Sequence, residues 1–350
     1  MVNLNTKFHD GITSKFAQES LVANRLSSDY EFSGAKTVKV LTPITVAMQD
    51  YTRSGSNRYG TPTEMQDIVQ ELTLSQDKSF TITIDKGNLE DQNYAKNTMT
   101  MVAVQMRERA IPEMDKYVLN MLAKKAGKIV GQTAETTTGN VCARISDATK
   151  YLDDNEVPVN DRTLFVSADT YRLLKHSNEY MAVEGLAREA IRRGTVGRYD
   201  AMEVVKVPAS RWPLNANFII VHKNAAVAPV KLSETKVHQD PPGISGALLE
   251  GRQYYDLFVF GARCDGVYAD VDVRTGKGIV CAKPAIAANG ALSCATAGAV
   301  IHFTTDGTDP RFSTTAKTGT VSDMSAVGTK VRAYAELEGG YPSEVETKTL

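Results

Sequence analysis

Residues 89–126, LEDQNYAKNTMTMVAVQMRERAIPEMDKYVLNMLAKKA, decide how the rest of this chain is organised. Apolar residues recur within this stretch at intervals of three and four, which is the spacing of one face of an α-helix. The stripe consists of Met99, Val102, Met106, Ala110, Met114, Tyr117 and Met121. We expect one long helix with the stripe as an ordinary core face, and a Met-rich binding surface is the alternative. Pro112 should kink this helix, and Gly127 should end it.

The segments that precede the helix have the composition of β-strands. Residues 37–48 are rich in β-branched side chains, and Pro43 marks an edge or a bulge. Apolar and polar residues then alternate in residues 68–74 and again in residues 79–85, as in strands with one wet face. We expect these two strands to form a long hairpin arm. A hairpin alone is marginal in water, so this arm needs another surface to lie on.

The start of the chain is polar, with a few scattered apolar residues. Ile12, Phe16 and Leu21 are spaced for a short amphipathic helix. We expect residues 1–30 to form an arm that becomes ordered on a partner. An arm, an extended β-loop and a long helix, in that order, are typical of a subunit that reaches over its neighbours.

Short elements alternate in residues 162–272. The run Leu164-Phe165-Val166 predicts a buried strand, and Ser167 is placed to cap a helix that carries Tyr171 and Leu174. We expect a second helix over 182–193, closed by Gly194, and further strands over 203–207, 218–221 and 254–260. This pattern predicts a mixed α/β domain around a central sheet.

The last part of the chain has no helical periodicity. Residues 278–284 have the composition of a linker, and residues 299–305, 330–335 and 343–347 have the composition of strands. Turn sequences separate them, such as Asp306-Gly307 and Gly339-Gly340. We therefore expect residues 285–350 to form a small all-β module, near the lower size limit for independent folding.

Composition excludes several classes of protein. The chain has 350 residues, which favours two domains, and a net charge of −1, which argues against a dedicated nucleic-acid binder. No apolar run is long enough to span a bilayer, and the first residues lack the pattern of a secretory signal. We expect the four cysteines to be free buried thiols in a reducing cytoplasm.

The motifs of common enzymes and metal sites do not occur in the sequence. Phosphate-binding, dinucleotide-binding, nucleophile-elbow and zinc-protease patterns are absent, and the five histidines are dispersed. Asp306 and Asp309 have oxygen ligands suited to calcium, although turn capping by the same residues is the favoured interpretation. Asp270 and Asp272 resemble a carboxylate pair, although a solvated strand face is favoured. We expect no catalytic residue, no cofactor and no metal ion.

Several segments together resemble the major capsid proteins of tailed bacteriophages. Phe32-Ser33-Gly34-Ala35-Lys36-Thr37-Val38-Lys39-Val40 resembles the start of that family's extended loop, and residues 79–85, running into Glu113-Met114-Asp115-Lys116-Tyr117, resemble its loop return and spine helix. Gly194-Thr195-Val196-Gly197, followed by Val204-Val205-Lys206-Val207-Pro208-Ala209-Ser210-Arg211, is similar to a stretch of its axial domain. Ala201 departs from the pattern, because a turn glycine is expected there.

This resemblance covers roughly residues 30–275 and implies an α+β, Hong Kong 97-type capsid fold. The parts would be an N-terminal arm (1–30) and a capsid domain (31–277), with an E-loop at about 48–85, a spine helix at about 89–126 and an axial domain at about 160–272. The loop tip carries Arg53, Arg58 and Tyr59 as candidates for contact with a neighbouring subunit. Arginine suits contacts with a neighbour's carboxylates, and a merely solvated tip is the alternative. The tip has no lysine, so we expect no isopeptide cross-link from it.

The tail resembles an immunoglobulin-like module found after chitobiase and β-hexosaminidase catalytic domains. The residues that carry this resemblance are His302-Phe303-Thr304-Thr305-Asp306-Gly307-Thr308-Asp309-Pro310, Val331-Arg332-Ala333-Tyr334-Ala335 and Gly340-Tyr341-Pro342-Ser343. The resemblance implies a small Ig-like sandwich, which on a capsid subunit would lie outside the shell.

The two resemblances together imply a function. The expected protein is a major capsid subunit that self-assembles through pentamers and hexamers into an icosahedral virion shell inside the bacterial host cytoplasm. Its expected partners are itself, portal and scaffolding proteins, packaged double-stranded DNA without sequence readout, and host-surface or mucus glycans at the tail. The alternatives are an encapsulin-like nanocompartment shell and a carbohydrate-binding surface protein.

Overall fold

The computed structural model describes residues 20–22, 25–28, 36–43, 45–46, 48–54, 56–61, 64, 67–87, 98–177, 197–319 and 329–350. Its internal contacts divide the chain into two units. The first unit comprises Met1–Gly34, Leu74–Val259 and Asp265–Gly278, and the second comprises Ala35–Thr73, Phe260–Cys264 and Ile279–Leu350. The domain boundaries expected from the sequence stay a prediction. Each unit is described by itself below.

A six-stranded mixed sheet forms the centre of the first unit, in the order β4-β13-β8-β5-β7-β6. Its strands are β4 (Lys128–Gln132), β5 (Arg162–Ser167), β6 (Arg198–Tyr199), β7 (Met202–Val207), β8 (Ala216–His222) and β13 (Val267–Asp272). β13 pairs parallel with β4, β5 pairs parallel with β7, and the other pairs are antiparallel. The apolar runs of β5 and β8 follow from burial on both faces of the sheet.

Helices cover the two faces of this sheet. On one face, α4 (Val141–Asp154) and α5 (Ala168–Lys175) contribute Ile145, Leu152 and Leu174 to a buried cluster with Leu164 and Phe218. The other face lies against the long helix through β8 and β13. The Ser167 hydroxyl accepts a 3.0 Å hydrogen bond from the Thr170 amide, which confirms the predicted cap. The helix predicted over 182–193 lies outside the described residues.

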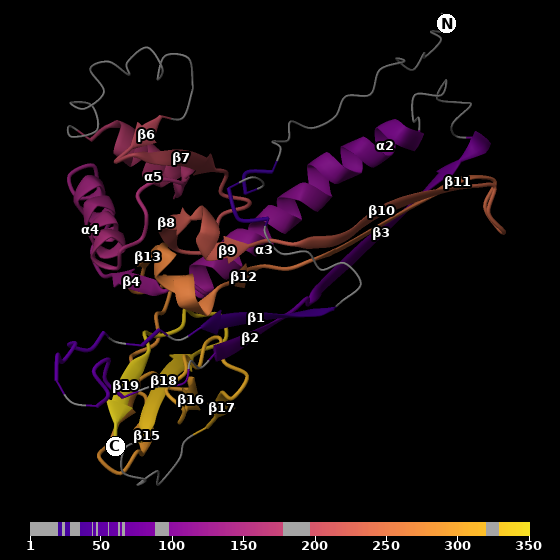
Figure 1. The fold of residues 1–350 in the computed structure, drawn as a ribbon. Helices are drawn as coiled ribbons and strands as arrows, with labels where there is room; N and C mark the ends of the chain where they lie inside the picture. Colours follow the sequence, from indigo (N-terminus) through magenta and orange to yellow (C-terminus); the bar gives the residue numbers. More distant parts are fainter. Residues whose placement is uncertain are drawn as a thin grey trace, which may run out of the picture. The chain divides into compact units, whose positions relative to one another are not determined.

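The long helix consists of α2 (Thr98–Gln105), a π-helical segment η1 (Met106–Ala110) and α3 (Ile111–Lys124), which form one continuous rod (Figure 1). The Ile111 amide bonds to the Met106 carbonyl, five residues back. This wider turn lies directly before Pro112, whose ring would clash with a regular α-helical turn. The π segment is therefore the local response to Pro112. Residues 89–97 lie outside the described part of the chain.

The apolar stripe predicted as the core face is only partly buried. The described members from Val102 to Met121 are all of intermediate exposure, and the fully buried residues of α3 are Asp115, Val118, Leu119, Leu122 and Ala123. The prediction was wrong because α3 presents a second, leucine-rich track to the sheet. Asp115, the carboxylate in that buried track, has hydrogen-bond partners of its own.

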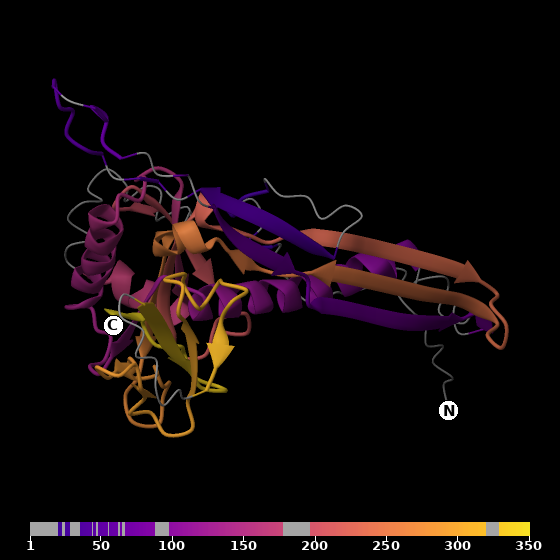
Figure 2. The same ribbon diagram turned by 60° about the horizontal axis from the view of Figure 1, so that its bottom comes forward.

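Beside the rod runs a three-stranded antiparallel ribbon of β10 (Val230–Gln239), β11 (Gly246–Tyr255) and β3 (Gln76–Asp85) (Figure 2). The sequence predicted that residues 68–74 pair with residues 79–85, and this is wrong. β3 pairs with β11, while β2 (Asp67–Thr73) pairs with β1 (Thr37–Pro43). Residues 68–74 and 79–85 therefore do not form a hairpin with each other.

Two short connections complete the first unit. β9 (Ala226–Val227) pairs with β12 (Phe258–Val259), and η2 (Lys223–Ala225) precedes β9. The predicted strand over 254–260 is thus divided between β11 and β12. Between β6 and β7, Asp200 and Ala201 both have positive φ, at 50° and 61°. A two-residue turn of this kind favours glycine, so the expected turn geometry is present although Ala201 occupies it.

The second unit contains the β1–β2 hairpin and the tail, with part of the 3-10 helix η3 (Gly261–Gly266). The tail has a four-stranded sheet, in the order β17-β16-β18-β19, and a two-stranded sheet. Its strands are β14 (Ala285–Ile286), β15 (Leu292–Ser293), β16 (Val300–Thr304), β17 (Lys317–Thr318), β18 (Lys330–Glu336) and β19 (Glu346–Thr349). Ile301, Phe303 and Val331 belong to its buried core. The tail is all-β, as predicted, and its Ig-like identity stays a prediction.

Tight turns join the tail strands where the sequence predicted them. Gly307 and Gly339 have φ values of +79° and +78°, which favour glycine. The Gly340 amide bonds to the Leu337 carbonyl at 3.0 Å, and the space around Gly339 is open.

Candidate inter-subunit surfaces

The tip of the β1–β2 hairpin holds the three residues that the sequence selected. The Thr52 amide bonds to the Arg58 carbonyl at 3.1 Å, and the rings of Tyr51 and Tyr59 meet edge to face, with centroids 5.0 Å apart. Tyr59 is 87% exposed, and the side chains of Arg53 and Arg58 are exposed. The tip is thus a closed turn that presents two cations and an aromatic ring to solvent. The structure does not test their contact with a neighbouring subunit.

Exposed apolar side chains extend along the same hairpin. Met48 is 99% exposed and Leu41 is 63% exposed, and Leu41 lies opposite the exposed Val69 in the strand register. Lys39 and Glu71 form a 2.8 Å ion pair on the outward face of the same strands. Scattered apolar residues are normal on a protein surface, but Met, Leu and Tyr gathered on one thin arm indicate a contact surface. The sequence analysis selected the tip and missed these apolar positions.

A buried carboxylate holds the chain where β3 begins. Asp256 accepts hydrogen bonds from the Ser75 amide at 2.8 Å, the Tyr117 hydroxyl at 2.7 Å and the Leu257 amide at 2.7 Å. Burial is the main cause that raises the pKa of Tyr117 to about 12, so the phenol remains a donor at ordinary pH. Asp256 therefore fixes the first residues of the ribbon to α3 within the first unit.

A second buried carboxylate joins the rod to residues 20–21 and to the segment between β7 and β8. Asp115, fully buried on α3, accepts from the Ser20 hydroxyl at 2.7 Å, the Leu21 amide at 2.9 Å and Arg211 Nη1 at 2.9 Å. The Arg211 side chain is itself only 5% exposed. Leu21 lies in a bend, and the other two residues of the short helix predicted from the sequence, Ile12 and Phe16, lie outside the described residues. Asp115 thus holds Ser20 and Leu21 against α3.

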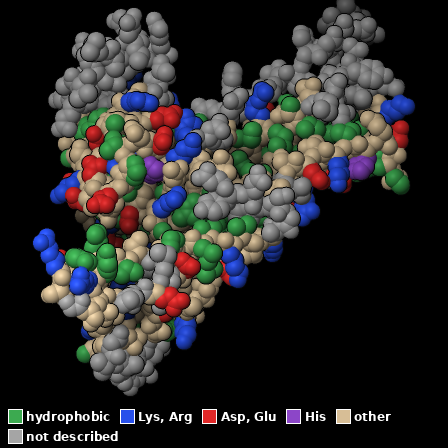
Figure 3. Space-filling view, viewed as in Figure 1, with side chains coloured by type: hydrophobic (Ala, Val, Ile, Leu, Met, Phe, Trp, Pro, Cys, Tyr) green, Lys and Arg blue, Asp and Glu red, His purple; other side chains and the backbone are tan. Residues whose placement is uncertain are grey.

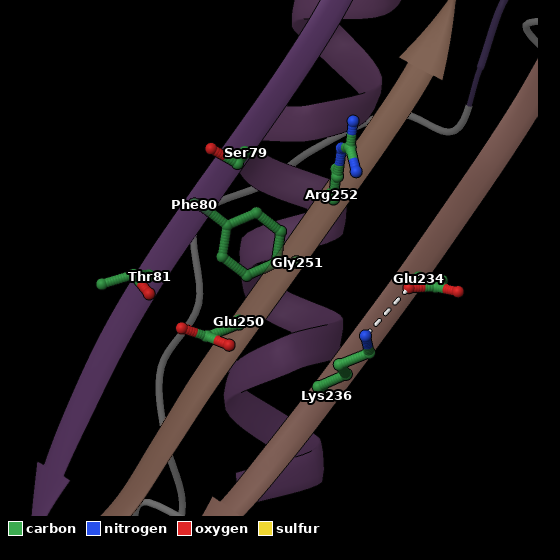
Figure 4. A pocket seen from close by; sticks show the side chains of 8 residues that line it. All are labelled: Ser79, Phe80, Thr81, Glu234, Lys236, Glu250, Gly251 and Arg252. Atoms are coloured by element: carbon green, nitrogen blue, oxygen red, sulfur yellow. Dashed lines mark ion pairs between the residues drawn. The ribbon is translucent and has the colours of Figure 1, made fainter.

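The ribbon carries a shallow recess with mixed charges (Figure 4). The recess is surrounded by Glu234, Lys236, Glu250 and Arg252. Arg252 also donates hydrogen bonds from Nε and Nη2 to the two carboxylate oxygens of Asp77. Gly251 lies opposite Phe80, whose ring occupies the space that a Cβ at Gly251 would need, 2.2 Å from Cε1. Each exposed ion pair of this kind contributes little to the stability of the fold. These charged side chains are therefore better suited to polar contacts than to stabilising the folded chain.

The carboxylates considered for chemistry have structural partners. Asp270 is fully buried and accepts from Gln132 Nε2 and Asn217 Nδ2, both at 2.6 Å. Burial raises the pKa of Asp270, whereas bidentate bonding from Arg274 lowers the pKa of Asp272. The favoured solvated face was wrong, because β13 lies inside the sheet with both faces covered. The two carboxylates therefore differ: Asp270 is buried and bonded to two side-chain amides, whereas Asp272 is bonded to Arg274.

The tail carboxylates act as turn caps and ion-pair partners. Asp306 accepts from the Thr308 amide at 2.9 Å, and Asp309 pairs with Arg311 at 2.9 Å and Arg332 at 3.2 Å. These bonds agree with the favoured capping interpretation. Across the described ranges, no group of three or more His, Cys, Asp or Glu residues is placed to hold a metal ion.

The aromatic side chains of the tail point inward. Phe303, Tyr334 and Tyr341 are buried, and Phe312 is partly buried against Gly261 within the second unit. Sugar binding by stacking needs exposed aromatic faces, so the described tail offers no such platform. None of the four cysteines forms a disulfide; Cys142, Cys264 and Cys281 are buried as predicted, whereas Cys294 is partly exposed. No helix in the described part of the chain has the length and apolar character to cross a membrane.

Comparison with known proteins identifies the fold. No protein-family model matches the sequence, and no curated protein matches it. A structure from Mycobacterium phage Che8 aligns with a TM-score of 0.63 at 18% identity, over 76% of this chain and 96% of that chain. The capsid of cyanophage P-SCSP1u aligns with a TM-score of 0.65 at 13% identity, over 77% and 93% of the two chains. The mature capsid of bacteriophage PhiM1 aligns with a TM-score of 0.61 at 14% identity, over 78% and 92%. This chain therefore has the fold of bacteriophage capsid structures.

Proposed function

We propose that this chain is the major capsid protein of a tailed bacteriophage and self-assembles through pentamers and hexamers into an icosahedral shell around the genome. The observation that carries this proposal is the fold shared with phage capsid structures, which are matched over more than nine tenths of their own length. The role is structural and not enzymatic.

The hairpin supports a function in assembly. A thin arm with exposed Met48, Leu41, Tyr51 and Tyr59 has more apolar surface than it can bury by itself. In a closed shell, one such patch is used in every copy, so individually weak contacts sum to a stable assembly. Arg53 and Arg58 would then pair with carboxylates of the neighbouring subunit.

The parts of a Hong Kong 97-type subunit can be assigned to the described elements. We assign the E-loop to the β1–β2 hairpin, the spine to α2–η1–α3, the rest of the peripheral domain to the ribbon, and the axial domain to the six-stranded sheet with its helices. The E-loop in this assignment covers 37–73, not the 48–85 expected from sequence, because β3 belongs to the ribbon.

The tail is assigned as an Ig-like decoration on the outside of the shell. The phage structures match only 76–78% of this chain, so it carries residues beyond the shared fold. An all-β module with its own core supports this assignment. The inward aromatic side chains do not support glycan stacking, so we regard a host-surface or mucus glycan as the least supported partner.

The remaining partners follow from the proposed role. A shell subunit assembles in the host cytoplasm with portal and scaffolding proteins and becomes part of the virion. Its inner face would contact packaged double-stranded DNA through backbone charge, without sequence readout. No observation on this chain favours a nanocompartment over a virion.

The proposal is tested by electron microscopy of the fastest-sedimenting particles from cells that express the full chain together with its scaffold. Closed icosahedral shells with small external knobs are the expected result. A monodisperse monomer or small oligomer at high concentration would overturn the proposal.

Deletions separate the parts of the proposal. Removing residues 52–66 should stop shell formation, whereas removing 285–350 should leave smooth shells. Met48→Ser should weaken assembly, and Leu214→Ser is the matched control, because Leu214 is 77% exposed in the first unit. If the tail deletion abolishes assembly and the tip deletion does not, the assignments of both parts are wrong.

A further inference from the structure

The β1–β2 hairpin has little of its own to keep it ordered. It is a separate two-stranded sheet, and a hairpin of two strands is marginal in water. Leu41, nearer the tip, is 63% exposed, whereas Leu72 is 1% exposed. We call residues 37–40 and 70–73, which pair with each other at the inner end of the hairpin, its base. Contacts at the base are therefore what can restrain the hairpin in the free chain.

One contact of the base joins β2 to η3. The Gly261 amide donates a 2.9 Å hydrogen bond to Gln70 Oε1. Phe260 and Cys264, which precede and follow Gly261 in the chain, are each 5% exposed. Residues 260–264 belong to the second unit together with the hairpin and the tail. They thus form a buried segment that bonds to the base of the hairpin.

The tail contacts the same η3 segment. The Phe312 side chain lies against Gly261, so closely that a Cβ at position 261 would be 3.1 Å from Phe312 Cβ and 3.2 Å from its Cγ. Arg311 Nη2 donates to Cys264 Sγ at 3.6 Å. Glycine at 261 is what allows this approach of a side chain to the backbone.

The visible surface of the tail differs from this contact. In Figure 3, charged, polar and hydrophobic side chains are mixed over the face of the tail that is seen. Phe312, in contrast, is a partly buried ring packed against the chain of η3. The contact with η3 is therefore a specific one and not an ordinary exposed side chain of the tail.

Asp309 fixes the contacting side chains to the tail sheet. Its carboxylate accepts from the Arg311 amide at 3.0 Å and pairs with Arg311 Nη2 at 2.9 Å. It also pairs at 3.2 Å with Arg332 of β18, and its carbonyl accepts from the Phe312 amide at 3.1 Å. Residues 309–312 are thus held in one conformation by the tail itself.

We propose that the tail braces the hairpin through η3. Contacts run in series from residues 309–312 to Gly261 and from Gly261 to Gln70, and we call these residues the brace. The brace acts in the free subunit, where it keeps the hairpin ordered before neighbours are present. In the proposed shell, neighbouring subunits would hold the same hairpin, so loss of the brace is compatible with shells formed by a chain without residues 285–350.

Hydrogen–deuterium exchange of the full, unassembled chain, read by mass spectrometry, tests the brace independently of shell formation. Phe312→Ala removes the ring from Gly261 and leaves the buried tail residues Ile301, Phe303 and Val331 unchanged. The expected result is several-fold faster exchange in peptides that cover residues 67–73, because the hairpin opens locally more often. Exchange in the peptides that cover β16 and β18 should stay the same.

Leu350→Ala is the matched control. Leu350 is a partly buried apolar residue of the tail that packs on the tail core, so its truncation weakens the tail at its core instead of at η3. It should leave the exchange of residues 67–73 unchanged. Equal acceleration by both substitutions overturns the proposal, as does unchanged hairpin exchange in a Phe312→Ala chain whose tail is folded.

Gln70→Met breaks the other link of the series. Methionine has nearly the length of glutamine but no amide oxygen to accept the hydrogen bond from Gly261. Gln70→Met should speed the exchange of the hairpin about as much as Phe312→Ala does. The double variant should exchange no faster than the faster single variant, because breaking either link already releases the hairpin. Additive acceleration would show two independent contacts and would contradict the brace.

Discussion

The substitution Asp115→Asn tests whether the buried carboxylate holds three parts of the first unit together. Asparagine keeps the shape of the side chain and removes its charge, which breaks the 2.9 Å ion pair with the Arg211 guanidinium, whose side chain is only 5% exposed. Breaking a buried ion pair by removing one charge costs about 3–5 kcal/mol. The Ser20 and Leu21 donors, at 2.7 and 2.9 Å, lose strength as well.

Urea unfolding of the unassembled subunit measures this loss. Trp212, the single tryptophan of the chain, is next to Arg211, and its indole donates to the Ala216 carbonyl at 2.6 Å. Its fluorescence therefore reports on the affected region. With ordinary urea dependence, a loss of this size lowers the midpoint by roughly 1–2 M.

The control is Glu113→Gln on the same helix. Glu113 forms a 3.7 Å pair with Lys78 in which both side chains are more than half exposed, so its loss should cost less than about 1 kcal/mol. The double variant Asp115→Asn with Arg211→Met should recover part of the loss, because no unpaired charge remains buried. If Asp115→Asn costs no more than the control, or if the two losses are additive, the reasoning is refuted.

Three other substitutions give results that oppose simple intuition. Ala201→Gly should stabilise the protein by about 1 kcal/mol, because Ala201 has φ of 61°, and thermal unfolding would show a higher midpoint. Gly251→Ala should destabilise it by about 1–3 kcal/mol in urea unfolding, because the new Cβ would meet the Phe80 ring, and Phe80→Ala should relieve the effect. Burial raises the pKa of Asp270, so the folded state binds its proton more tightly. The contribution of Asp270 to stability should therefore decrease as pH rises above about 3.8, and Asp270→Asn should remove this dependence in unfolding measured from pH 4 to 7.

Local pattern predicted the elements of this chain better than their partners. The apolar runs at Leu164 and Phe218 predicted strands, and Ser167 predicted a helix start, because burial on both faces and capping are local requirements. The pairing of β3 with β11 joins residues more than 160 positions apart. The alternation of apolar and polar residues shows that the strand containing Phe80 has a packed face. It does not show which strand pairs with it.

Two errors have the same physical origin. Asp270 alternates with apolar residues, as a residue on a solvated face does, but its strand lies inside a sheet covered on both sides. The Met stripe of the long helix has helical spacing, but Leu119 and Leu122 form a second track that packs on the sheet. Amphipathic pattern is ambiguous wherever an element has neighbours on more than one side.

The candidate contact surface was predicted in part. Sequence selected Arg53, Arg58 and Tyr59, because a polar tip between strands is recognisable, and the structure places them on a closed, exposed turn. Met48 and Leu41 were missed, because an apolar side chain in a strand is ordinarily expected to be buried. In the structure Leu41 points to solvent from the paired strand β1, and Met48 lies beyond the end of that strand and is almost fully exposed.

The open turn at Gly339 makes the tail a candidate scaffold for peptide display. An epitope inserted there would replace one main-chain hydrogen bond, between Gly340 and Leu337, and would meet no neighbouring atoms at Gly339. Surface turns of this kind tolerate insertion. The buried residues Val331 and Tyr341 on either side would keep the graft anchored in a folded module, which is the property that an antigen carrier needs.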